Sequence, residues 1–338
     1  MSAERSRSVW PVSRRRALSL IAGAAGLMVA PLGRGSRSEP PIYQWRGVAL
    51  GAEASLRLAH PDRKEATRAV QLCLDEIARL ERIFSLHRPD SELSRLNRDG
   101  RLKAASHDLR ILLAEARRFG ELSGGAFDVT VQPLWRLYAA HFAAHPGDSL
   151  GPPAARLEAA RRLVDYRAIA LDGAQVRLLR PGMGVTLNGI AQGYITDRVA
   201  DLLRAAGFAS VLVQLGETFA GDPPSDGSAW RIGIPDPFAP ERLIERLDAV
   251  DLAIATSSGH ATRFDAAGRH HHLLDPLTGR SADRCASVTV LAQDAATADA
   301  LSTALAILPL AAAPGLLRKA EAKAFYVASN GSRHWLNA

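Results

Sequence analysis

The sequence predicts a single α+β domain, built from mixed sheets and packed helices, over residues 39–338. Segments with strand periodicity and segments with helix periodicity follow one another without regular alternation, which favours this fold class over a doubly wound parallel sheet. The chain shows no internal repeat and no linker that would divide the domain. Its 338 residues are 47% hydrophobic and 23% charged, so a large core is available and wholesale disorder is excluded.

The first half of the domain is predicted from periodicity and from turn residues. Residues 43–58 alternate partly around Gly51 and predict strands. Residues 65–84 carry apolar side chains three and four positions apart, which predicts a helix with Cys73 on its buried face. The next amphipathic helix, 109–122, is expected to end before the glycine pair at 124–125. The further expected elements are helices 133–142 and 154–164, a Pro/Gly-rich loop 145–153 and a hairpin 169–178.

The second half continues with strands, short turns and two helices. A helix over 190–206 is expected to end at a glycine, and a buried strand 211–215 follows it. Residues 262–274 are expected to be β material with a turn at a glycine. The remaining expected elements are strands 230–234, 247–255, 287–291, 324–327 and 333–336 and a helix 295–307. The last two strands are joined through Asn330-Gly331, a dipeptide typical of a hairpin turn.

Composition excludes several classes of protein. No apolar run reaches the ~18 residues of a membrane span, which excludes a polytopic membrane protein. There are only two cysteines, Cys73 and Cys285, which excludes a disulfide framework and a Cys-rich zinc site.

The basic character of the chain is confined to its first 38 residues. This segment has seven arginines and one acid, so it holds +6 of the formal net charge of +7, and the remainder keeps +1. The basic start precedes a short apolar run, 17–32, and the stretch Ser-Arg-Arg-Arg-Ala-Leu at 13–18 looks like a twin-arginine motif. We therefore expect residues 1–38 to be an export signal with a short linker. The mature protein is then periplasmic, with membrane association only through an uncleaved signal or through a partner protein.

The alternative for this N-terminal segment is a basic tail that binds a membrane or nucleic acid. The order of charge and apolar run is the order that a signal needs, which favours export. A domain near neutrality gives no reason to expect a nucleic-acid partner.

Two loops in the first half hold polar and glycine residues in patterns that a routine scaffold does not need. Residues 84–97 join the end of a helix to a polar stretch with a new cap at Asp90 or Ser91; alone, they are explained as a capped loop. Residues 123–135 combine two glycines, which let a backbone approach a ligand closely, with two aromatic side chains that offer flat surfaces to a ring. Alone, this second loop is explained as a helix end followed by a strand.

A third segment, 186–197, runs from a strand through a glycine-bearing turn into a helix. The free N–H groups and the positive dipole end of such a helix suit a phosphate group. The glycine spacing is neither that of a dinucleotide-binding fingerprint nor that of a P-loop.

The fourth segment lies near the C-terminus and combines oxygen ligands with histidines. In 298–304, Asp299 and Thr303 are four positions apart and share one helix face. A carboxylate and a hydroxyl are hard oxygen ligands that suit Mg²⁺, although alone the pair is explained as an ordinary polar stripe. Upstream, 270–279 begins with three histidines, of which the outer two would point one way in a strand and the middle one the other. A metal site at these histidines would need further ligands that the sequence does not place.

In this order and spacing, the segments resemble the ApbE family, the FAD:protein FMN transferases. The resemblance runs from about residue 43 to about residue 309, nearly all of the chain after the signal. It rests on the loop 84–97, Gly-Gly-Ala-Phe-Asp at 124–128, Gly-Ile-Ala-Gln-Gly-Tyr at 189–194, His-Leu-Leu-Asp-Pro-Leu-Thr-Gly at 272–279 and Ala-Asp-Ala-Leu-Ser-Thr-Ala at 298–304.

The resemblance implies a single ApbE-like flavin transferase domain. Such a domain cleaves FAD and attaches FMN by a phosphoester bond to a Thr or Ser of a target flavoprotein, with release of AMP and a requirement for Mg²⁺. By matched position, Asp299, Thr303 and the backbone carbonyl of Gly189 would hold Mg²⁺, and Ser302 occupies a further metal-side position. His272 matches the proposed base, and the near-neutral titration of a histidine suits that role. The positions matched to FAD contacts are Leu50, His87, Ala126, Phe127, Asp128, Thr186, Gln192 and Leu273.

Several positions depart from the common family pattern. Thr186 stands where many members have Asp, Gln192 where they have Lys or Glu, and His87 where an aromatic ring commonly faces the flavin. The run Thr-Leu-Asn-Gly-Ile-Ala-Gln-Gly-Tyr looks like a branch linked to flavinylation of the nitrous-oxide reductase maturation system, which would make these changes a habit of that branch. The alternatives are an FAD-binding maturation or carrier protein without transferase activity and a periplasmic metal-binding protein that uses the three histidines.

Overall fold

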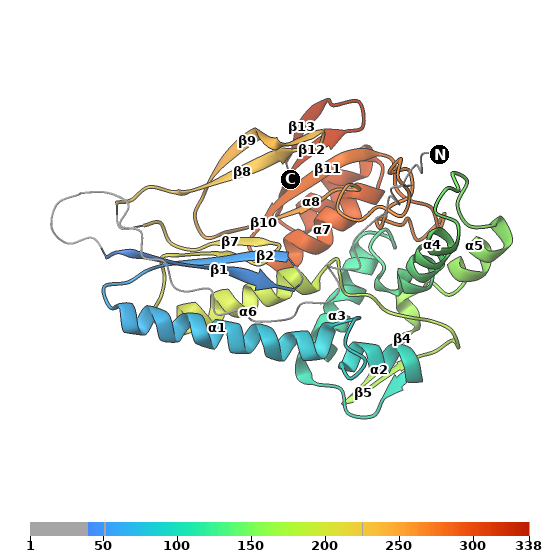
Figure 1. Ribbon diagram of the computed structural model, residues 1–338, viewed down its shortest axis with the longest axis horizontal. Coiled ribbons are helices and arrows are strands. Elements are labelled where there is room, and N and C mark those ends of the chain that lie inside the picture. Colours follow the sequence, from blue (N-terminus) through green and yellow to red (C-terminus); the bar gives the residue numbers. More distant parts are fainter. Residues whose placement is uncertain (1–39, 51, 225, 338) are drawn as a thin grey trace, which may run out of the picture.

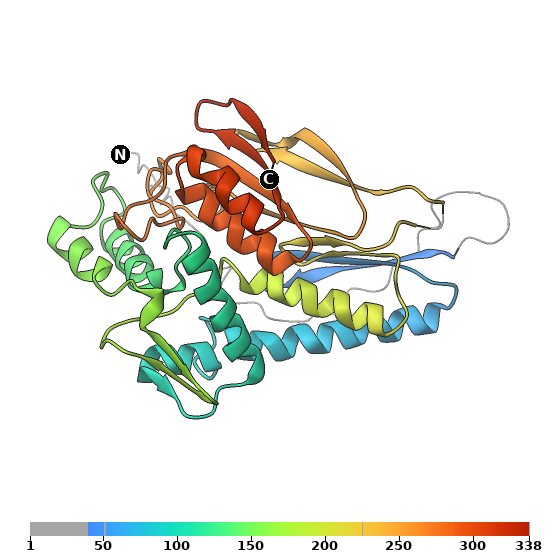
Figure 2. The ribbon, with the colours of Figure 1, turned by 180° about the vertical axis from the view of Figure 1, so that it is seen from behind.

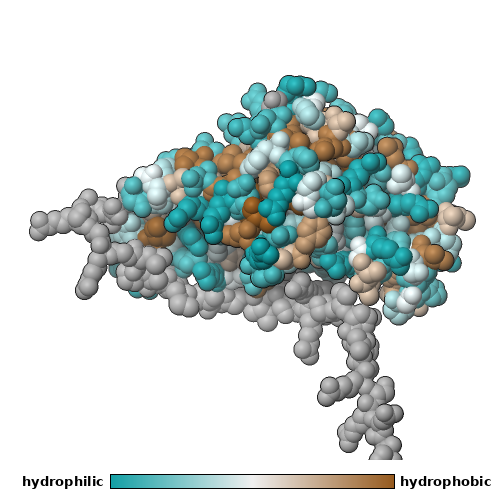
Figure 3. Space-filling model, turned by 90° about the horizontal axis from the view of Figure 1, so that it is seen from above, coloured by the Kyte–Doolittle hydropathy of each residue, from teal (hydrophilic) through white to brown (hydrophobic). Residues whose placement is uncertain are grey.

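The computed structural model describes residues 40–50, 52–224 and 226–337. The expected export signal at 1–38 lies outside them. None of the helices in this part of the chain has the length and hydropathy needed to span a bilayer. The surface seen from above mixes hydrophilic side chains with interspersed apolar ones, which is ordinary for a folded domain (Figure 3).

An antiparallel sheet of eight strands forms the centre of the structure (Figure 1). Its spatial order is β1-β2-β6-β7-β10-β11-β12-β13, so strands from both ends of the chain share one sheet. The strands are β1 (Ile42–Ala49), β2 (Ala52–Ala59), β6 (Val211–Gln214), β7 (Thr218–Ala220), β10 (Leu252–Ser257), β11 (Cys285–Ala292), β12 (Lys323–Ala328) and β13 (Arg333–Leu336).

The two faces of this sheet pack against different partners. Successive side chains of strand β6, which point to opposite faces, show this. In β6, Val211 and Val213 belong to the large core, whereas Leu212 packs with Trp230 and Ile232 in a second, smaller core. The smaller core lies under a two-stranded hairpin, and helices cover the opposite face (Figure 2). The hairpin consists of β8 (Trp230–Asp236) and β9 (Ala239–Ala249), and the covering helices are α1 (Arg63–Phe84), α6 (Ala191–Ala205), α7 (Ala295–Ile307) and α8 (Ala313–Lys319).

A lobe of short helices lies beside the main sheet and is drawn in green in Figure 1. A small antiparallel sheet of order β3-β5-β4 belongs to it. The elements of the lobe are α2 (Glu92–Asp99), β3 (Arg101–Leu102), α3 (His107–Leu122), α4 (Gln132–Ala144), α5 (Ala154–Arg161), β4 (Ile169–Asp172), β5 (Gln175–Leu178) and the 3₁₀ turns η1 (Val129–Val131) and η2 (Tyr166–Ala168). The short segment η3 (Leu310–Ala312) precedes α8. The architecture is the α+β fold that the sequence predicts.

Local sequence signals explain where the helices begin and end. The side chain of Asp62 accepts the backbone N–H of Lys64 at 2.7 Å and caps α1. Ser91 caps α2, and Gly100 ends that helix with φ +68°, a conformation that glycine adopts without strain. Asp294 caps α7 in the same way as Asp62 caps α1.

The structure departs from the predicted elements at four places. The expected strand 247–255 is the end of β9 and the start of β10, and the chain turns between them at Asp251, which has φ +45°. The expected capped loop at 84–97 contains helix α2, because the Ser91 cap precedes two leucines, Leu93 and Leu96, that are buried on one helix face. Residues 262–274 form turns instead of strands, with the expected turn at Gly268 and two isolated bridges, Arg263 with His271 and Leu274 with Ser281. The short elements β3, β7 and α8 were not predicted, because so few residues hold less than two periods of any pattern.

Candidate functional site

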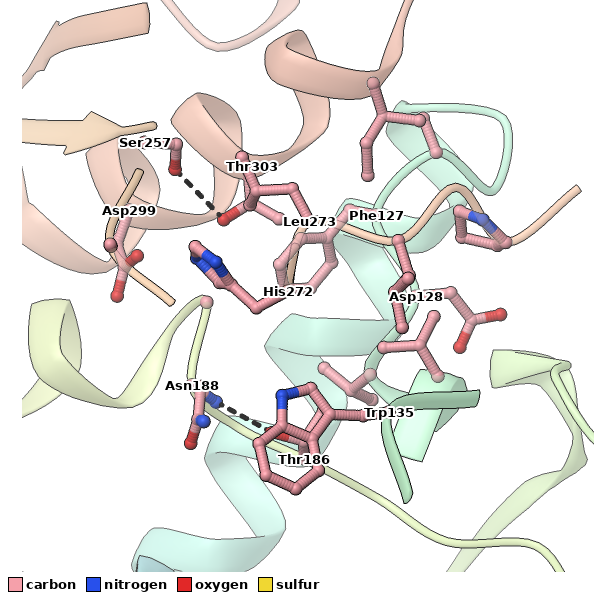
Figure 4. Close-up of a pocket in the computed structure, with 18 of the residues that line it drawn as sticks. Phe127, Asp128, Trp135, Thr186, Asn188, Ser257, His272, Leu273, Asp299 and Thr303 are labelled. Carbon is pink, nitrogen blue, oxygen red and sulfur yellow. Dashed lines mark hydrogen bonds between the residues drawn. The ribbon is translucent and has the colours of Figure 1, made fainter. Parts of the chain in front are cut away.

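A pocket of about 190 Å³ opens between the lobe of short helices and the α6–α7 side of the main sheet (Figure 4). Ten of the predicted site residues line it together, although they come from four separate stretches of the chain. They are Ala126, Phe127, Asp128, Thr186, Gly189, Gln192, His272, Leu273, Asp299 and Thr303. The lining also contains Trp135, Asn188, Glu217 and the segment 256–258 at the end of β10.

Asp299 is positioned by the close crossing of α6 over the start of α7. The backbone N–H of Gly193 donates to Oδ2 of Asp299 at 3.1 Å, which places the carboxylate at the positive end of α6. Gly193 allows this approach, since a Cβ atom there would lie 2.2 Å from the carbonyl oxygen of Ala295. Asp197, one turn further along α6, accepts the backbone N–H groups of Ala295 and Ala296 at 2.6 and 2.8 Å. The two helices are therefore joined at the point where Asp299 enters the pocket.

Thr303 lies one turn after Asp299 and faces the same pocket, as the sequence spacing predicts (Figure 4). Its hydroxyl lies 3.4 Å from Oγ of Ser257. A Cβ atom at Gly189 would lie 2.9 Å from Oγ1 of Thr303, so the backbone of Gly189 packs directly against this hydroxyl. Ser302 is 1% exposed and does not line the pocket; its Oγ contacts Oγ of Ser257 at 2.7 Å and donates to the backbone oxygen of Asp299 at 3.0 Å. Ser302 therefore fixes α7 against β10 from behind.

A second buried carboxylate, Glu217, was missed by the sequence reasoning. It follows β6 and lines the pocket with Asp299; the exposed fractions are 9% and 4%. Burial raises the pKa of Glu217 to about 7, and burial together with the charge of Glu217 raises the pKa of Asp299 well above its usual range. The available signal was an acidic residue placed directly after a buried strand and a glycine, Gly216, which has φ +101°.

His272 enters the pocket between Thr303 and the ring of Phe127 (Figure 4). Both its backbone N–H and its ring Nδ1 contact the carbonyl oxygen of Thr262, at 3.0 and 3.2 Å. A carbonyl only accepts, so Nδ1 carries the proton and Nε2 of the neutral ring keeps a free lone pair. The expected near-neutral titration is corrected here, because burial lowers the pKa of His272 to about 4.

The other two histidines of the triplet have different surroundings. His270 packs against Phe142 at a ring distance of 5.0 Å, and His271 is buried with its Nδ1 unpaired. Neither lines the pocket. Throughout the part of the chain that the structure describes, no group of three or more His, Cys, Asp or Glu side chains is arranged to hold a metal ion. A metal site built on the three histidines therefore has no support.

Asp128 lines the pocket, but hydrogen bonds within the lobe occupy its carboxylate. Oδ1 accepts the N–H and the hydroxyl of Thr130 at 2.7 and 2.6 Å, and Oδ2 accepts the N–H of Tyr166 at 3.0 Å. In Figure 4 this carboxylate points away from His272 and Thr303. Burial raises the pKa of Asp128 to about 6 despite these three bonds. The carboxylate of Asp128 therefore stabilises the loop that carries Phe127.

Two of the predicted FAD-contacting residues lie outside this pocket. His87 lines a neighbouring hollow of about 500 Å³, which shares Trp135 and Asn188 with the first pocket. Leu50 lines neither hollow; it sits in the turn between β1 and β2 with φ +55°, and its N–H donates to Glu81 at 2.9 Å. The volumes of the two adjacent hollows together fall inside the range of about 300–1,000 Å³ that is typical of small-molecule sites.

Thr186 and Gln192 both line the pocket near the start of α6, and neither side chain carries a charge. The backbone N–H of Asn188 donates to the hydroxyl of Thr186 at 3.3 Å (Figure 4). The amide of Gln192 lies over Gly216, where a Cβ atom would be 2.4 Å from its Nε2.

Residues 50–326 match the profile of the ApbE family. The chain belongs to the ApbE family. It is 35% identical over 231 residues to the FAD:protein FMN transferase of Vibrio cholerae, which covers 67% of this chain and 69% of that protein. It is 31% identical over 279 residues to a FAD:protein FMN transferase of Klebsiella pneumoniae, with coverage of 79% and 83%.

Solved ApbE structures share the fold. The ApbE protein of Thermotoga maritima superposes with a TM-score of 0.76 at 28% identity, covering 87% of this chain and 97% of the other. The flavinyl transferase ApbE of Pseudomonas stutzeri superposes with a TM-score of 0.74 at 27% identity, covering 89% and 97%. The single ApbE-like α+β domain predicted from the sequence is therefore confirmed.

The oxygen donors of the pocket fit the Mg²⁺ that membership of the ApbE family implies. Asp299 and Thr303 project from one face of α7, and the backbone of Gly189 closes against Thr303. All of these are hard oxygen donors, which Mg²⁺ prefers. No Lys or Arg is among the described residues that line this pocket, whereas Arg98 and Arg136 line the neighbouring hollow.

Proposed function

We propose that this chain is an exported, Mg²⁺-dependent FAD:protein FMN transferase that modifies a Thr or Ser of a target flavoprotein. The observation that carries the proposal is a single pocket in which a buried carboxylate and a hydroxyl of α7 face the imidazole of His272 (Figure 4). The FAD:protein FMN transferases of other bacteria, at 31–35% identity over most of their length, support it.

The proposed reaction breaks one bond and forms one bond at the FMN phosphorus of FAD. The hydroxyl oxygen of the acceptor attacks that phosphorus, and the new O–P bond forms while the P–O bond to the AMP half breaks. AMP leaves with the bridging oxygen, and the hydroxyl proton passes to a base on the enzyme. No group is oxidised or reduced. Such a reaction depends on positioning, on neutralised phosphate charge and on a proton acceptor.

His272 is the residue of this pocket that we assign as the proton acceptor. Its Nδ1–H is directed to Thr262, which leaves Nε2 as the acceptor. Its low pKa keeps the ring neutral at pH 7, so no proton has to leave the ring before it takes one from the acceptor hydroxyl.

Asp299, Thr303 and the carbonyl of Gly189 would hold Mg²⁺, which supplies positive charge beside the pyrophosphate oxygens. The chain prepares this site with the Gly193 N–H on Asp299 and with the contacts that Ser257 and Ser302 make behind α7. Phe127 and Trp135 offer apolar ring surfaces to the flavin.

The test of the proposed function is direct. The purified chain is mixed with FAD, Mg²⁺ and a candidate acceptor domain, and flavin fluorescence on the acceptor band is recorded after denaturing electrophoresis. We expect a fluorescent band that requires Mg²⁺ and disappears when the acceptor Thr or Ser is replaced by Ala. Tight FAD binding without label on any acceptor would reject the proposal.

A second candidate function is an FAD-binding maturation or carrier protein without transfer. The observation that favours it is the uncharged pair Thr186 and Gln192 at the pocket entrance. It predicts a purified protein that keeps FAD intact, whereas slow release of FMN and AMP from FAD would count against it.

Export and the branch of the family are part of the proposal. Replacing Arg14 and Arg15 by Lys should retain the full chain in the cytoplasm, and continued export would refute a twin-arginine route. The run Thr-Leu-Asn-Gly-Ile at 186–190 supports a flavoprotein of the nitrous-oxide reductase maturation system as target. That flavoprotein is therefore the first acceptor to test. If it stays unlabelled while another acceptor is labelled, the assignment to this branch is rejected.

A further inference from the structure

The turn between β6 and β7 directs a carboxylate into the pocket that the proposed metal site does not use. β6 ends at Gln214, and the backbone N–H of Leu215 donates to the carbonyl oxygen of Glu217 at 2.9 Å. Gly216 makes this tight turn with φ +101°, where a side chain would be strained and would collide with Gln192. The turn therefore fixes the backbone on both sides of Glu217 and holds its side chain in the pocket wall.

The buried carboxylates of the pocket have no cationic side chain as a partner in the described part of its lining. Glu217 and Asp299 are both more than nine-tenths buried and line the same pocket. Each lies beside backbone N–H groups, of Thr256 and Gly193 respectively, yet no Lys or Arg is among the described residues that line the pocket. Two buried carboxylates without a cationic partner are unfavourable, because burial penalises each charge and the charges repel.

We propose that Glu217 is the second carboxylate of the divalent-cation site, and that it supplies, with Asp299, the two negative charges that match Mg²⁺. The proposal rests on the proposed function for the presence of the cation and adds to it a residue of this chain. Mg²⁺ takes carboxylate oxygens and keeps several waters, so a second carboxylate in the pocket lining would complete the site either at the ion or at its water shell. Thr303 and the carbonyl of Gly189 are neutral donors and cannot supply this charge.

A neighbouring carboxylate provides a matched control. Asp197 is also buried and also raises the pKa of Asp299. Both of its oxygens, however, already accept backbone N–H groups at the start of α7, and it does not line the pocket. Asp197→Asn therefore removes a nearby negative charge without removing a pocket carboxylate.

The test is Mn²⁺ binding to the full chain without FAD, measured by electron paramagnetic resonance, with Mg²⁺ competition and with circular dichroism as the check of folding. We expect Glu217→Gln to weaken the binding of Mn²⁺ by at least about tenfold, which is a common result of removing a group around a metal. Asp197→Asn should change the affinity far less. Glu217→Asp keeps the charge but shortens the side chain, and it should fall between wild type and Glu217→Gln.

The outcomes separate this inference from the proposed function. If folded Glu217→Gln and Glu217→Asp bind Mn²⁺ as wild type does, the role of Glu217 is wrong while transfer by the wild type stands. If Asp197→Asn unfolds at the same urea concentration as wild type, which shows that α6 and α7 stay joined, and still loses as much affinity as Glu217→Gln, general charge and not Glu217 explains the effect, and the inference falls. If the wild type neither binds Mn²⁺ nor transfers FMN, the proposed function and the inference fall together.

Discussion

Replacing Gly193 by Ala tests the crossing of α6 and α7 that positions Asp299. The added methyl group would lie 2.2 Å from the carbonyl oxygen of Ala295 and 2.7 Å from Cα of Ala296, distances that no relaxed structure contains. The helices must separate, and the N–H of Gly193 must then leave the carboxylate of Asp299, which it contacts at 3.1 Å. The single methyl group therefore acts on helix packing and on the candidate metal site at once.

The size of the effect follows from three contributions. Overpacking costs about 1–3 kcal/mol. Loss of a hydrogen bond to a buried charged group costs about 1.5–3 kcal/mol. Ala in place of Gly inside a helix returns about 1 kcal/mol. We therefore expect the free energy of unfolding to fall by about 1.5–5 kcal/mol, and the melting temperature by about 2 °C for each kcal/mol in a chain of this size.

The assay is urea unfolding followed by far-ultraviolet circular dichroism, repeated with saturating Mg²⁺. Gly315→Ala is the matched control, because Gly315 is also helical but a Cβ atom there meets nothing within 4 Å. This control should gain about 0.5–1 kcal/mol. If Gly193→Ala is as stable as wild type and gains as much stability from Mg²⁺, the reasoning about this crossing is refuted.

Three further changes have defined outcomes. Asp299→Ala should abolish FMN transfer and leave FAD binding weakened but measurable, because a metal ligand beside the pyrophosphate is lost; fluorescence labelling and FAD titration check this, and a wild-type rate would reject the metal assignment. Gly189→Ala would bring a methyl group to 2.9 Å from Oγ1 of Thr303. FMN transfer should therefore fall by at least about tenfold, while the circular dichroism spectrum stays that of the wild type. Unchanged transfer would contradict the close packing at this site. The pKa of His272 is about 4 in the folded chain and about 6.5 in the unfolded chain, so below pH 6.5 the unfolded state takes up a proton that the folded state does not. The free energy of unfolding of the wild type should therefore drop more steeply between pH 6.5 and pH 4 than that of His272→Gln. The difference in slope should be at most about 1.4 kcal/mol per pH unit, measured by urea unfolding. Parallel curves for the two proteins would show that burial does not lower this pKa.

Elements with several periods and clear ends could be predicted from the sequence. Helix α7 has the predicted bounds 295–307, and Asp299 and Thr303 face one pocket as their spacing requires. The hairpin at 324–336 and the long helix α1 follow from the same kind of signal. Residues 262–274 could be predicted only in part: the turn at Gly268 and the antiparallel contact of Arg263 with His271 are present, but the pairing is too short to form strands, and side-chain contacts such as the N–H of His270 on Asp265 at 2.9 Å hold the rest.

The surroundings of the site residues could not be predicted from spacing, since distant segments create them. Glu217 has no periodic signal, and its burial depends on β10, α7 and the turn before α6. The pKa of His272 depends on how deeply the tertiary structure buries the ring. Asp128 matched a ligand-contacting position, yet only the fold shows that its carboxylate holds Thr130 and Tyr166.

The pocket takes its lining from positions between residues 126 and 307, and the sheet beside it pairs strands from both ends of the domain. Contacts between residues so far apart in the chain form late in folding, because loop closure must come first. A partly folded chain therefore has no fragment of this pocket that could bind FAD or a cation. Ligand at about 100 times its dissociation constant then stabilises the whole domain by about 2.7 kcal/mol, so ligand supply raises the fraction of the chain that keeps its native state.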